Sequence, residues 1–423
     1  MELNRTLGYY FPSFFRMNIG TGLLEDINRN NRATLNVYFH EYIHFYQDIA
    51  TIYGLQNISH TIDVIAAMNI NIAKSILLDI PVTISSEDIT GTNIALENLY
   101  IGHTNDLELS PSWQISNINV VKNGLIANFE DIPQIKIIFQ DGRSSGAFDL
   151  GSYCILESMA CEIDRYIFND YSHPEFPYNV CRKIFDNSFP PLVLTAESKA
   201  ILIAAICELS LNSFHPAEHF LRILKIIADQ HLFDIKQLYQ FVDTLQVNWK
   251  SQWINNIDLL PEFSSIAISQ LRMVINNSTH ADLVSWSEEL IESARVLRAK
   301  VNFICELSKA KSYEDKISCF TKTINYLGTP IIIDRMGNVG FQNPHFDCGS
   351  KAFYLIGIQS IHNLLRKGIV PCELRQNCRL TIPSLYNNDI CQRKPWVQAQ
   401  NEQLCPYAQV WKTWGYYGKT PNI

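Results

Sequence analysis

The sequence predicts a mainly α-helical protein with a smaller β-rich section, an α+β fold, and three patterns along its 423 residues carry this prediction. From Asp149 to about Tyr326, apolar residues recur almost throughout at the three- and four-residue spacing of helices. From about Ile80 to Gly146, short runs alternate apolar and polar residues between Gly, Asn and Asp, as strands do. The chain closes with a turn-rich tail that contains four cysteines.

The composition is that of an ordinary globular protein, with 47% hydrophobic and 18% charged residues. A formal net charge of −8 and the lack of a Lys/Arg cluster argue against a nucleic-acid partner. The start of the chain lacks the apolar core of a signal peptide, and the run at 201–206 is too short to span a bilayer, so we expect no membrane partner. Eleven scattered cysteines favour a reducing, cytoplasmic location. The many Asn and Ile residues suggest an AT-rich bacterial genome.

The first long element after an aromatic lead-in is a helix from Ala33 to about Tyr53. Asn31 or Thr34 could cap its start, and Gly54 is expected to end it. A second helix is expected at about 61–78. Apolar residues that would form the buried face of the first helix are Leu35, Phe39, Ile43, Tyr46 and Ala50.

This first helix contains the motif HExxH, as His40-Glu41-Tyr42-Ile43-His44. Two histidines four residues apart lie on the same helix face, so both imidazoles can bind one metal ion. The adjacent Glu41 is placed to act as a general base on a water. The alternative is a core helix with two structural histidines, but imidazoles beside a buried face need partners, and a shared metal supplies one to both.

The elements that follow are predicted from their periodicity. Within 80–146 the alternating runs are PVTISS, WQISNINVV, LIANFE and QIKIIFQ. Helices are predicted at 149–168, 197–213, 216–232, 234–256, 262–277 and 281–309. After Gly328, two short strands are expected around a Met-Gly-Asn turn, followed by a helix at about 351–366.

A catalytic zinc usually takes three protein ligands, and Glu157 is the best candidate for the third. It lies against an apolar helical stripe, where a carboxylate is costly unless it is paired. Asp164 is seven residues further on the same face, and could orient a ligand histidine or serve as the third ligand instead. Glu162 is expected to be solvated. The alternative for Glu157 is an ion pair with Arg165 or a neighbouring helix.

The sequence HEYIH followed downstream by LESMA resembles the gluzincin group of zinc metallopeptidases. The resemblance covers two short helices and implies a zincin-like catalytic core with His40, His44 and Glu157 as zinc ligands and Glu41 as general base. Glu157 comes 113 positions after His44, farther than in compact members of the group, and the β-rich section at about 80–146 would then be an insertion. We therefore expect a zincin-like core at 1–196, a helical region at 197–327 and a small α/β Cys-rich region at 328–423.

Such a peptidase also needs a donor that stabilises the oxyanion, usually Tyr, His or Arg. Tyr166, His173 and Tyr178 lie at or just past the end of the Glu157 helix, and are the candidates for this role.

Four cysteines fall within 34 residues of the tail: Cys372, Cys378, Cys391 and Cys405. The tail has little apolar surface of its own, so a metal could order it. The paired CxxC spacing of zinc ribbons is absent. A second, structural zinc is considered ahead of an iron–sulfur cluster, with free buried cysteines as the alternative, and Cys348 is a substitute ligand.

The leading functional hypothesis is a cytoplasmic zinc metallopeptidase that cleaves a protein or peptide substrate. The large helical region suggests restriction by a regulatory partner protein, for instance in a bacterial stress or anti-phage pathway. A second hypothesis is a non-enzymatic protein-binding module with a structural or lapsed metal site. A third is a di-iron oxygenase that uses Glu41 and His44, but its required second ExxH pair is missing.

Overall fold

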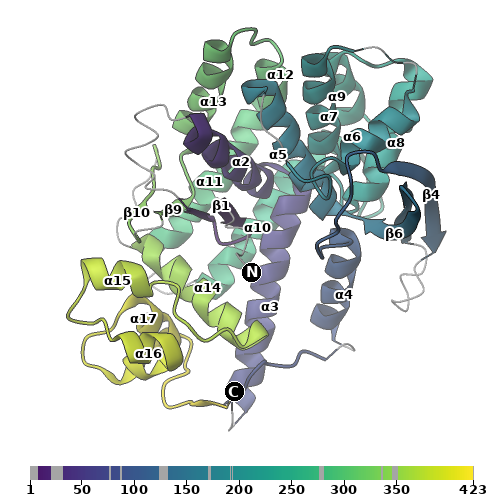
Figure 1. The fold of residues 1–423 in the computed structure, drawn as a ribbon. Coiled ribbons are helices and arrows are strands. Elements are labelled where there is room, and N and C mark those ends of the chain that lie inside the picture. Colours follow the sequence, from purple (N-terminus) through teal and green to yellow (C-terminus); the bar gives the residue numbers. More distant parts are fainter. Residues whose placement is uncertain are drawn as a thin grey trace.

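In the computed structural model the chain folds into a mainly helical protein with several small sheets, as the sequence predicts (Figure 1). The structure describes residues 8–20, 32–75, 78–85, 88–122, 132–169, 173–190, 192, 194–275, 281–334, 337–344 and 351–422. None of the helices in these ranges combines the length and the hydropathy needed to cross a membrane.

A four-stranded sheet joins the start of the chain to a segment near its end. Its strands lie in the order β1 (Gly8–Phe11), β2 (Arg16–Ile19), β9 (Ile331–Asp334) and β10 (Val339–Gly340). The β1–β2 and β9–β10 pairs are antiparallel, whereas β2 and β9 run parallel. The two predicted strands after Gly328 are confirmed, with residues 335–336 of their turn outside the described residues. The sheet thus crosses the expected boundary at 328.

The HExxH helix is α2 (Arg32–Ala50), and the next helix, α3 (Ile52–Lys74), follows it almost directly. The break occurs at Thr51, which is extended and accepts a hydrogen bond at its Oγ1 from the Gly54 backbone N–H at 3.1 Å. Gly54 therefore lies in the first turn of α3 and does not end α2, contrary to expectation. A Cβ at Gly54 would lie 2.3 Å from the carbonyl oxygens of Gln47 and Asp48, so only glycine fits this close approach.

The section at 80–146 is only partly β. It begins with a helix, α4 (Ile89–Ile101), which the sequence reading missed. Three antiparallel strands then form a sheet: β4 (Gln114–Lys122), β5 (Pro133–Asp141) and β6 (Ser144–Leu150). The run LIANFE lies outside the described residues. The short strand β3 (Leu78–Asp79) pairs with β11 (Pro421–Asn422) near the end of the chain.

The predicted helical region is confirmed in outline. Its helices are α5 (Ser152–Phe168), α6 (Val180–Ser188), α7 (Ala196–Ser210), α8 (Pro216–Gln230), α9 (Ile235–Asp243), α10 (Leu259–Ile275), α11 (Ala281–Lys300), α12 (Phe303–Leu307) and α13 (Tyr313–Leu327). The predicted helix at 234–256 is wrong in its second half, which forms a hairpin of β7 (Gln246–Trp249) and β8 (Gln252–Asn255). Lys250 and Ser251 take positive φ angles of 49° and 66° at its turn, a conformation that ends a helix.

The C-terminal region starts with the predicted helix α14 (Ala352–Lys367). Short helices follow, namely α15 (Arg375–Thr381), α16 (Asn388–Arg393), η4 (Pro395–Gln400) and α17 (Pro406–Thr413). Figure 1 shows α15, α16 and α17 grouped at one edge of the molecule, in yellow.

Candidate metal centre

Helices α2 and α5 pack against each other and place the two motifs face to face. The Nε2 atom of His40 lies 3.3 Å from Oε2 of Glu157, and the Nε2 atom of His44 lies 3.4 Å from the same oxygen. All three ligand atoms lie within 4.8 Å of one another. Zinc bonds of 2.0–2.2 Å in a tetrahedron separate neighbouring ligand atoms by roughly 3.3–3.5 Å. The two histidine–Glu157 spacings therefore match those of neighbouring ligands on a single tetrahedral cation.

The other ring nitrogen of each histidine is held by a second side chain. His40 Nδ1 lies 2.7 Å from Oδ2 of Asp164, and His44 Nδ1 lies 2.8 Å from Oε1 of Gln47. The Gln47 amide nitrogen donates to the Leu156 carbonyl at 3.0 Å, so its oxygen faces His44 and accepts the Nδ1 proton. When the two rings are neutral, their Nε2 lone pairs point at the Glu157 carboxylate and repel it. A cation bound between the three groups would remove this repulsion.

The sequence allowed Asp164 either to orient a ligand histidine or to be the third ligand, and its position in the structure suits the first of these. Its 2.7 Å approach to His40 is a hydrogen bond and is shorter than the spacing of two ligands on one ion. Gln47 was not anticipated, although its place three residues after His44 is the usual signal for contact on a helix.

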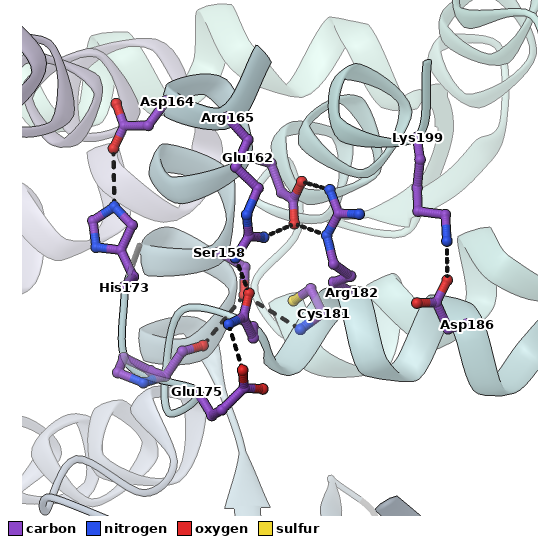
Figure 2. Close-up of polar contacts among 12 residues, drawn as sticks. Ser158, Glu162, Asp164, Arg165, His173, Glu175, Cys181, Arg182, Asp186 and Lys199 are labelled. Atoms are coloured by element: carbon purple, nitrogen blue, oxygen red, sulfur yellow. Dashed lines mark hydrogen bonds and ion pairs between the residues drawn. The ribbon is translucent and has the colours of Figure 1, made fainter. Parts of the chain in front are cut away.

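His173 lies behind Asp164. Its Nε2 is 3.2 Å from the Asp164 Oδ2 that also contacts His40, and Figure 2 shows its ring directed at this carboxylate. His40, Asp164 and His173 form a second group whose ligand atoms lie within 4.8 Å of one another. His173 is not among the residues that line the cavity beside the HExxH motif, but its ring stacks on that of the lining residue Tyr178, with the ring centroids 4.5 Å apart.

Tyr166 is not at the centre, which corrects its predicted catalytic role. Its hydroxyl donates to the Ala310 carbonyl at 2.7 Å, and the Lys316 ammonium lies 4.1 Å from its ring centroid. Tyr166 lies two residues after Asp164, so the helix turns its side chain towards α13 and away from α2.

Glu162 is buried rather than solvated, again contrary to expectation. Its Oε1 accepts from Arg165 Nη1 at 2.6 Å and from Arg182 Nε at 2.7 Å, and both guanidinium groups clamp it in Figure 2. Arg165 therefore pairs with Glu162, whereas Glu157 contacts the histidines.

The charges of the centre depend on one another. Burial lowers the pKa of His40, but the carboxylates of Asp164 and Glu157 outweigh it and hold the pKa well above its ordinary value. Burial likewise lowers the pKa of His44, and Glu157 reverses the effect. Burial raises the pKa of Glu157, and the two histidines bring it far below its ordinary range. A group of two bases and an ionised carboxylate thus attracts positive charge to one point.

A cavity of about 350 Å³ opens beside these ligands. Glu41, Tyr153 and Tyr178 line it together with His40 and His44. Burial raises the pKa of Glu41, with His44 and His40 opposing the rise. Glu41 makes no hydrogen bond to another residue in the described part of the chain, so its carboxylate is available to a molecule in the cavity. Burial, followed by Glu157, raises the pKa of Tyr178, which therefore stays protonated and able to donate.

Strand β1 forms one wall of the cavity, through Gly8, Tyr9 and Tyr10. A Cβ at Gly8 would lie 2.9 Å from Cγ of Glu41 and 3.1 Å from its Oε1. The missing side chain at Gly8 is what lets this strand lie against the general-base candidate.

Asp48 fixes β1 to the HExxH helix, although no sequence pattern singled out this residue. Its Oδ2 accepts from the Tyr10 hydroxyl at 2.8 Å and from the Ser13 backbone N–H at 2.7 Å. Burial raises the pKa of Asp48 to about 7, although these two hydrogen bonds act in the opposite direction.

The four tail cysteines are brought into the same small region. Cys372, Cys378 and Cys391 are buried, Cys405 is half-buried, and all four are free thiols. The Cys372 backbone N–H donates to the Cys391 carbonyl at 2.9 Å. Cys348 lies outside the described residues.

Comparisons with protein-family models, curated proteins and solved structures found no match to this chain.

Proposed function

We propose that this protein is a zinc-dependent metallopeptidase of gluzincin type, with His40, His44 and Glu157 as the zinc ligands and Glu41 as the general base. The observation that carries the proposal is the meeting of two histidine Nε2 atoms on one Glu157 oxygen at 3.3 and 3.4 Å, beside a cavity that Glu41 lines. Zinc bound there would lower the pKa of a water to about 7 and polarise a carbonyl group.

Glu41 would take the proton of the attacking water and pass it to the leaving nitrogen. Its raised pKa suits a group that must both accept and release a proton near neutral pH. Tyr178, protonated and in the cavity wall, would donate to the oxyanion that forms on the carbonyl. Asp164 and Gln47 would hold the histidines in the tautomer that exposes Nε2.

The wall strand β1 supports a peptide substrate. Among the strands that the structure describes, it lies at the edge of its sheet, paired on one side with β2, and it borders the cavity. An extended peptide could add to such an edge through backbone hydrogen bonds, which would carry its carbonyl groups past Glu41. The same proposal includes a zincin-like architecture. It also includes a restriction of cleavage to a particular partner or regulated substrate.

Peptidase activity is tested by incubating the zinc-loaded protein with a peptide library of diverse sequence and reading new amino termini by mass spectrometry. We expect cleavage by the wild type, and a loss of 10³-fold or more, roughly, in Glu41→Gln, because the general base is gone. Glu41→Gln should keep its zinc, while Glu157→Ala should lose both zinc and activity.

The matched control is Glu262→Gln, which changes a partly exposed carboxylate that pairs with Lys250 and is not among the residues lining the cavity. Zinc binding without any cleavage, together with an unchanged cellular effect of Glu41→Gln, would instead support the non-enzymatic binding module. The di-iron alternative has no support in the described residues, because Glu41 belongs to neither of their two candidate ligand groups.

A further inference from the structure

A second cavity, of about 150 Å³, lies between α3 and α4, two helices that contact each other (Figure 1). Gln56, His60 and Asp63 line it from α3, and Glu97 lines it from α4. Positions three or four residues apart share a helix face, so α3 presents one polar face to this cavity. A single water needs roughly 10–15 Å³ of such a volume, and the cavity is therefore large enough for one long side chain.

This cavity adjoins the one beside the metal centre. Tyr53 and Asn57, in the first two turns of α3, line both of them. Glu41 and Glu157 line only the cavity of the metal centre. A molecule bound beside these two residues therefore has a neighbouring space into which one of its side chains can extend.

The cavity between α3 and α4 is acidic. Oε2 of Glu97 lies 2.8 Å from Nε2 of His60, and Oδ1 of Asp63 accepts from Nε2 of Gln270 at 2.9 Å. None of the described residues that line the cavity is a lysine or an arginine. Burial raises the pKa of Asp63, with His60 opposing the rise, and a bound cation would favour the ionised carboxylate further. The charge of the cavity therefore favours a cationic ligand.

Two buried oxygens in the same cavity have no hydrogen-bond partner in the part of the chain that the structure describes. They are Oε1 of Gln56 and Oγ of Ser59, and Ser59 is only 8% exposed. A buried oxygen without a donor destabilises the folded state, so these two atoms indicate a ligand that donates to them. The ammonium group of lysine has three donors, the guanidinium group of arginine has five, and neither has an acceptor. A basic side chain thus matches both the charge and the unpaired oxygens.

We propose that the cavity between α3 and α4 is a specificity subsite that binds a lysine or arginine side chain of the substrate. Its cationic group would pair with Glu97 and Asp63 and donate to the oxygens of Gln56 and Ser59. This inference rests on the proposed peptidase function and names its substrate class, which is peptides with a basic residue at a fixed position from the cleaved bond.

Cleavage kinetics test the subsite. The new amino termini from the peptide library should show lysine or arginine at one fixed position. A peptide with lysine there is then compared with one that has norleucine, which lacks the ammonium group. Glu97→Gln should lower the ratio of the two kcat/KM values, lysine over norleucine, by about 10- to 100-fold, because a charge-assisted hydrogen bond is lost. The control is again Glu262→Gln, which should keep the ratio of the wild type.

Binding without cleavage separates the subsite from the peptidase proposal. In the zinc-loaded Glu41→Gln protein, fluorescence anisotropy gives the dissociation constants of labelled alanine-rich peptides with lysine or norleucine at successive positions. Lysine should bind about tenfold or more tightly at one position, and adding Glu97→Gln should remove the difference. Zinc content and circular dichroism report folding, and Asp63→Asn is the second variant if Glu97→Gln does not fold.

The two proposals fail in different ways. Binding that is selective for lysine and sensitive to Glu97→Gln, without any cleavage by the wild type, would keep the subsite and contradict the peptidase. Cleavage with no preference for a basic residue would overturn the subsite and leave the peptidase in place. A preference for lysine that both Glu97→Gln and Asp63→Asn retain would also overturn the subsite.

Discussion

At the scale of single residues, the central feature is the division of labour between carboxylates on one helix. Glu157, Glu162 and Asp164 lie within eight positions of α5, yet their partners differ. Glu157 faces the histidine pair of the HExxH motif, Glu162 faces two arginines, and Asp164 contacts His40 and His173. The sequence predicts Glu157 as the third ligand, and the structure places its carboxylate beside His40 and His44. It misjudged Glu162, because the partner Arg182 comes from the following helix and no local spacing signals that contact.

Asp164→Asn should weaken zinc binding by about 10- to 100-fold, because it removes the negative charge that orients and polarises His40. The dissociation constant is measured by competition with a chromophoric chelator. Asp186→Asn, at a carboxylate paired with Lys199 outside the centre, is the control and should bind zinc as the wild type does. Equal affinity in all three proteins would remove Asp164 from the centre.

Tyr178→Phe should lower kcat by about 10²-fold and leave KM and zinc content nearly unchanged, since the donor would act on charge that appears only in the transition state. The measurement is steady-state kinetics on a peptide found in the cleavage screen. Tyr153→Phe tests the other tyrosine of the cavity wall. A large loss of kcat in Tyr153→Phe, with none in Tyr178→Phe, would assign the role of oxyanion donor to Tyr153 instead.

At the scale of elements, α2 lies between β1 and α5, and Gly8 sets how closely β1 approaches. Periodicity predicted α2 and α5 to within a few residues, since long amphipathic helices carry a strong local signal. It did not predict α4 or the β7–β8 hairpin, where short segments leave helix and strand patterns hard to separate. Periodicity also did not predict the register of β1, whose neighbour β2 pairs with β9, a strand far away in the sequence.

Gly8→Ala should reduce kcat/KM by about tenfold or more while zinc stays bound, because the new Cβ would lie 2.8 Å from Val37 Cγ1 and 2.9 Å from Glu41 Cγ and would move the strand or the carboxylate. Peptide kinetics and zinc content on the same preparation separate the two effects. Gly142→Ala controls for a loss of stability without a change at the cavity, because its Cβ would meet nothing within 4 Å but its φ of 59° is strained for alanine. Unchanged kinetics in Gly8→Ala would argue against positioning by this strand.

At the scale of the whole molecule, the HExxH helix packs against β1, β2, α3, α5 and α11, and the start of the chain in turn contacts the C-terminal region. Arg16 of β2 illustrates this arrangement, since its guanidinium bonds Gln359 of α14 at 2.7 Å and Glu373 at 3.1 Å. The mainly helical class followed from the sequence. The four-stranded sheet contains strands from both sides of the domain boundary expected at 328, because β9 pairs with β2. Sequence patterns do not encode a pairing between strands so far apart in the chain.

Asp48 makes the stability of the whole protein depend on pH. Its pKa rises from 3.8 to about 7 on folding, so between these values the folded state holds a proton that the unfolded state has lost. The contribution of Asp48 is thus fully present below about pH 4 and is lost as the pH rises through about 7. In zinc-free protein, the free energy of unfolding should fall more steeply from pH 5 to pH 8 in the wild type than in Asp48→Asn.

Urea denaturation at both pH values gives this difference, and the histidines and Glu157 are common to both proteins. Identical slopes would show that Asp48 titrates normally in the folded state. Tyr10→Phe, which removes one hydrogen bond to Asp48, should raise the pKa of that carboxyl further and steepen the dependence.

The most direct test of the account is X-ray diffraction from crystals grown with zinc, with data collected on both sides of the zinc absorption edge. We predict an anomalous peak about 2.0–2.2 Å from Nε2 of His40, Nε2 of His44 and an oxygen of Glu157, and no such peak in Glu157→Ala. Zinc that is absent from this position in the wild type, or that leaves Glu157 out of its ligands, would contradict the assignment of the centre.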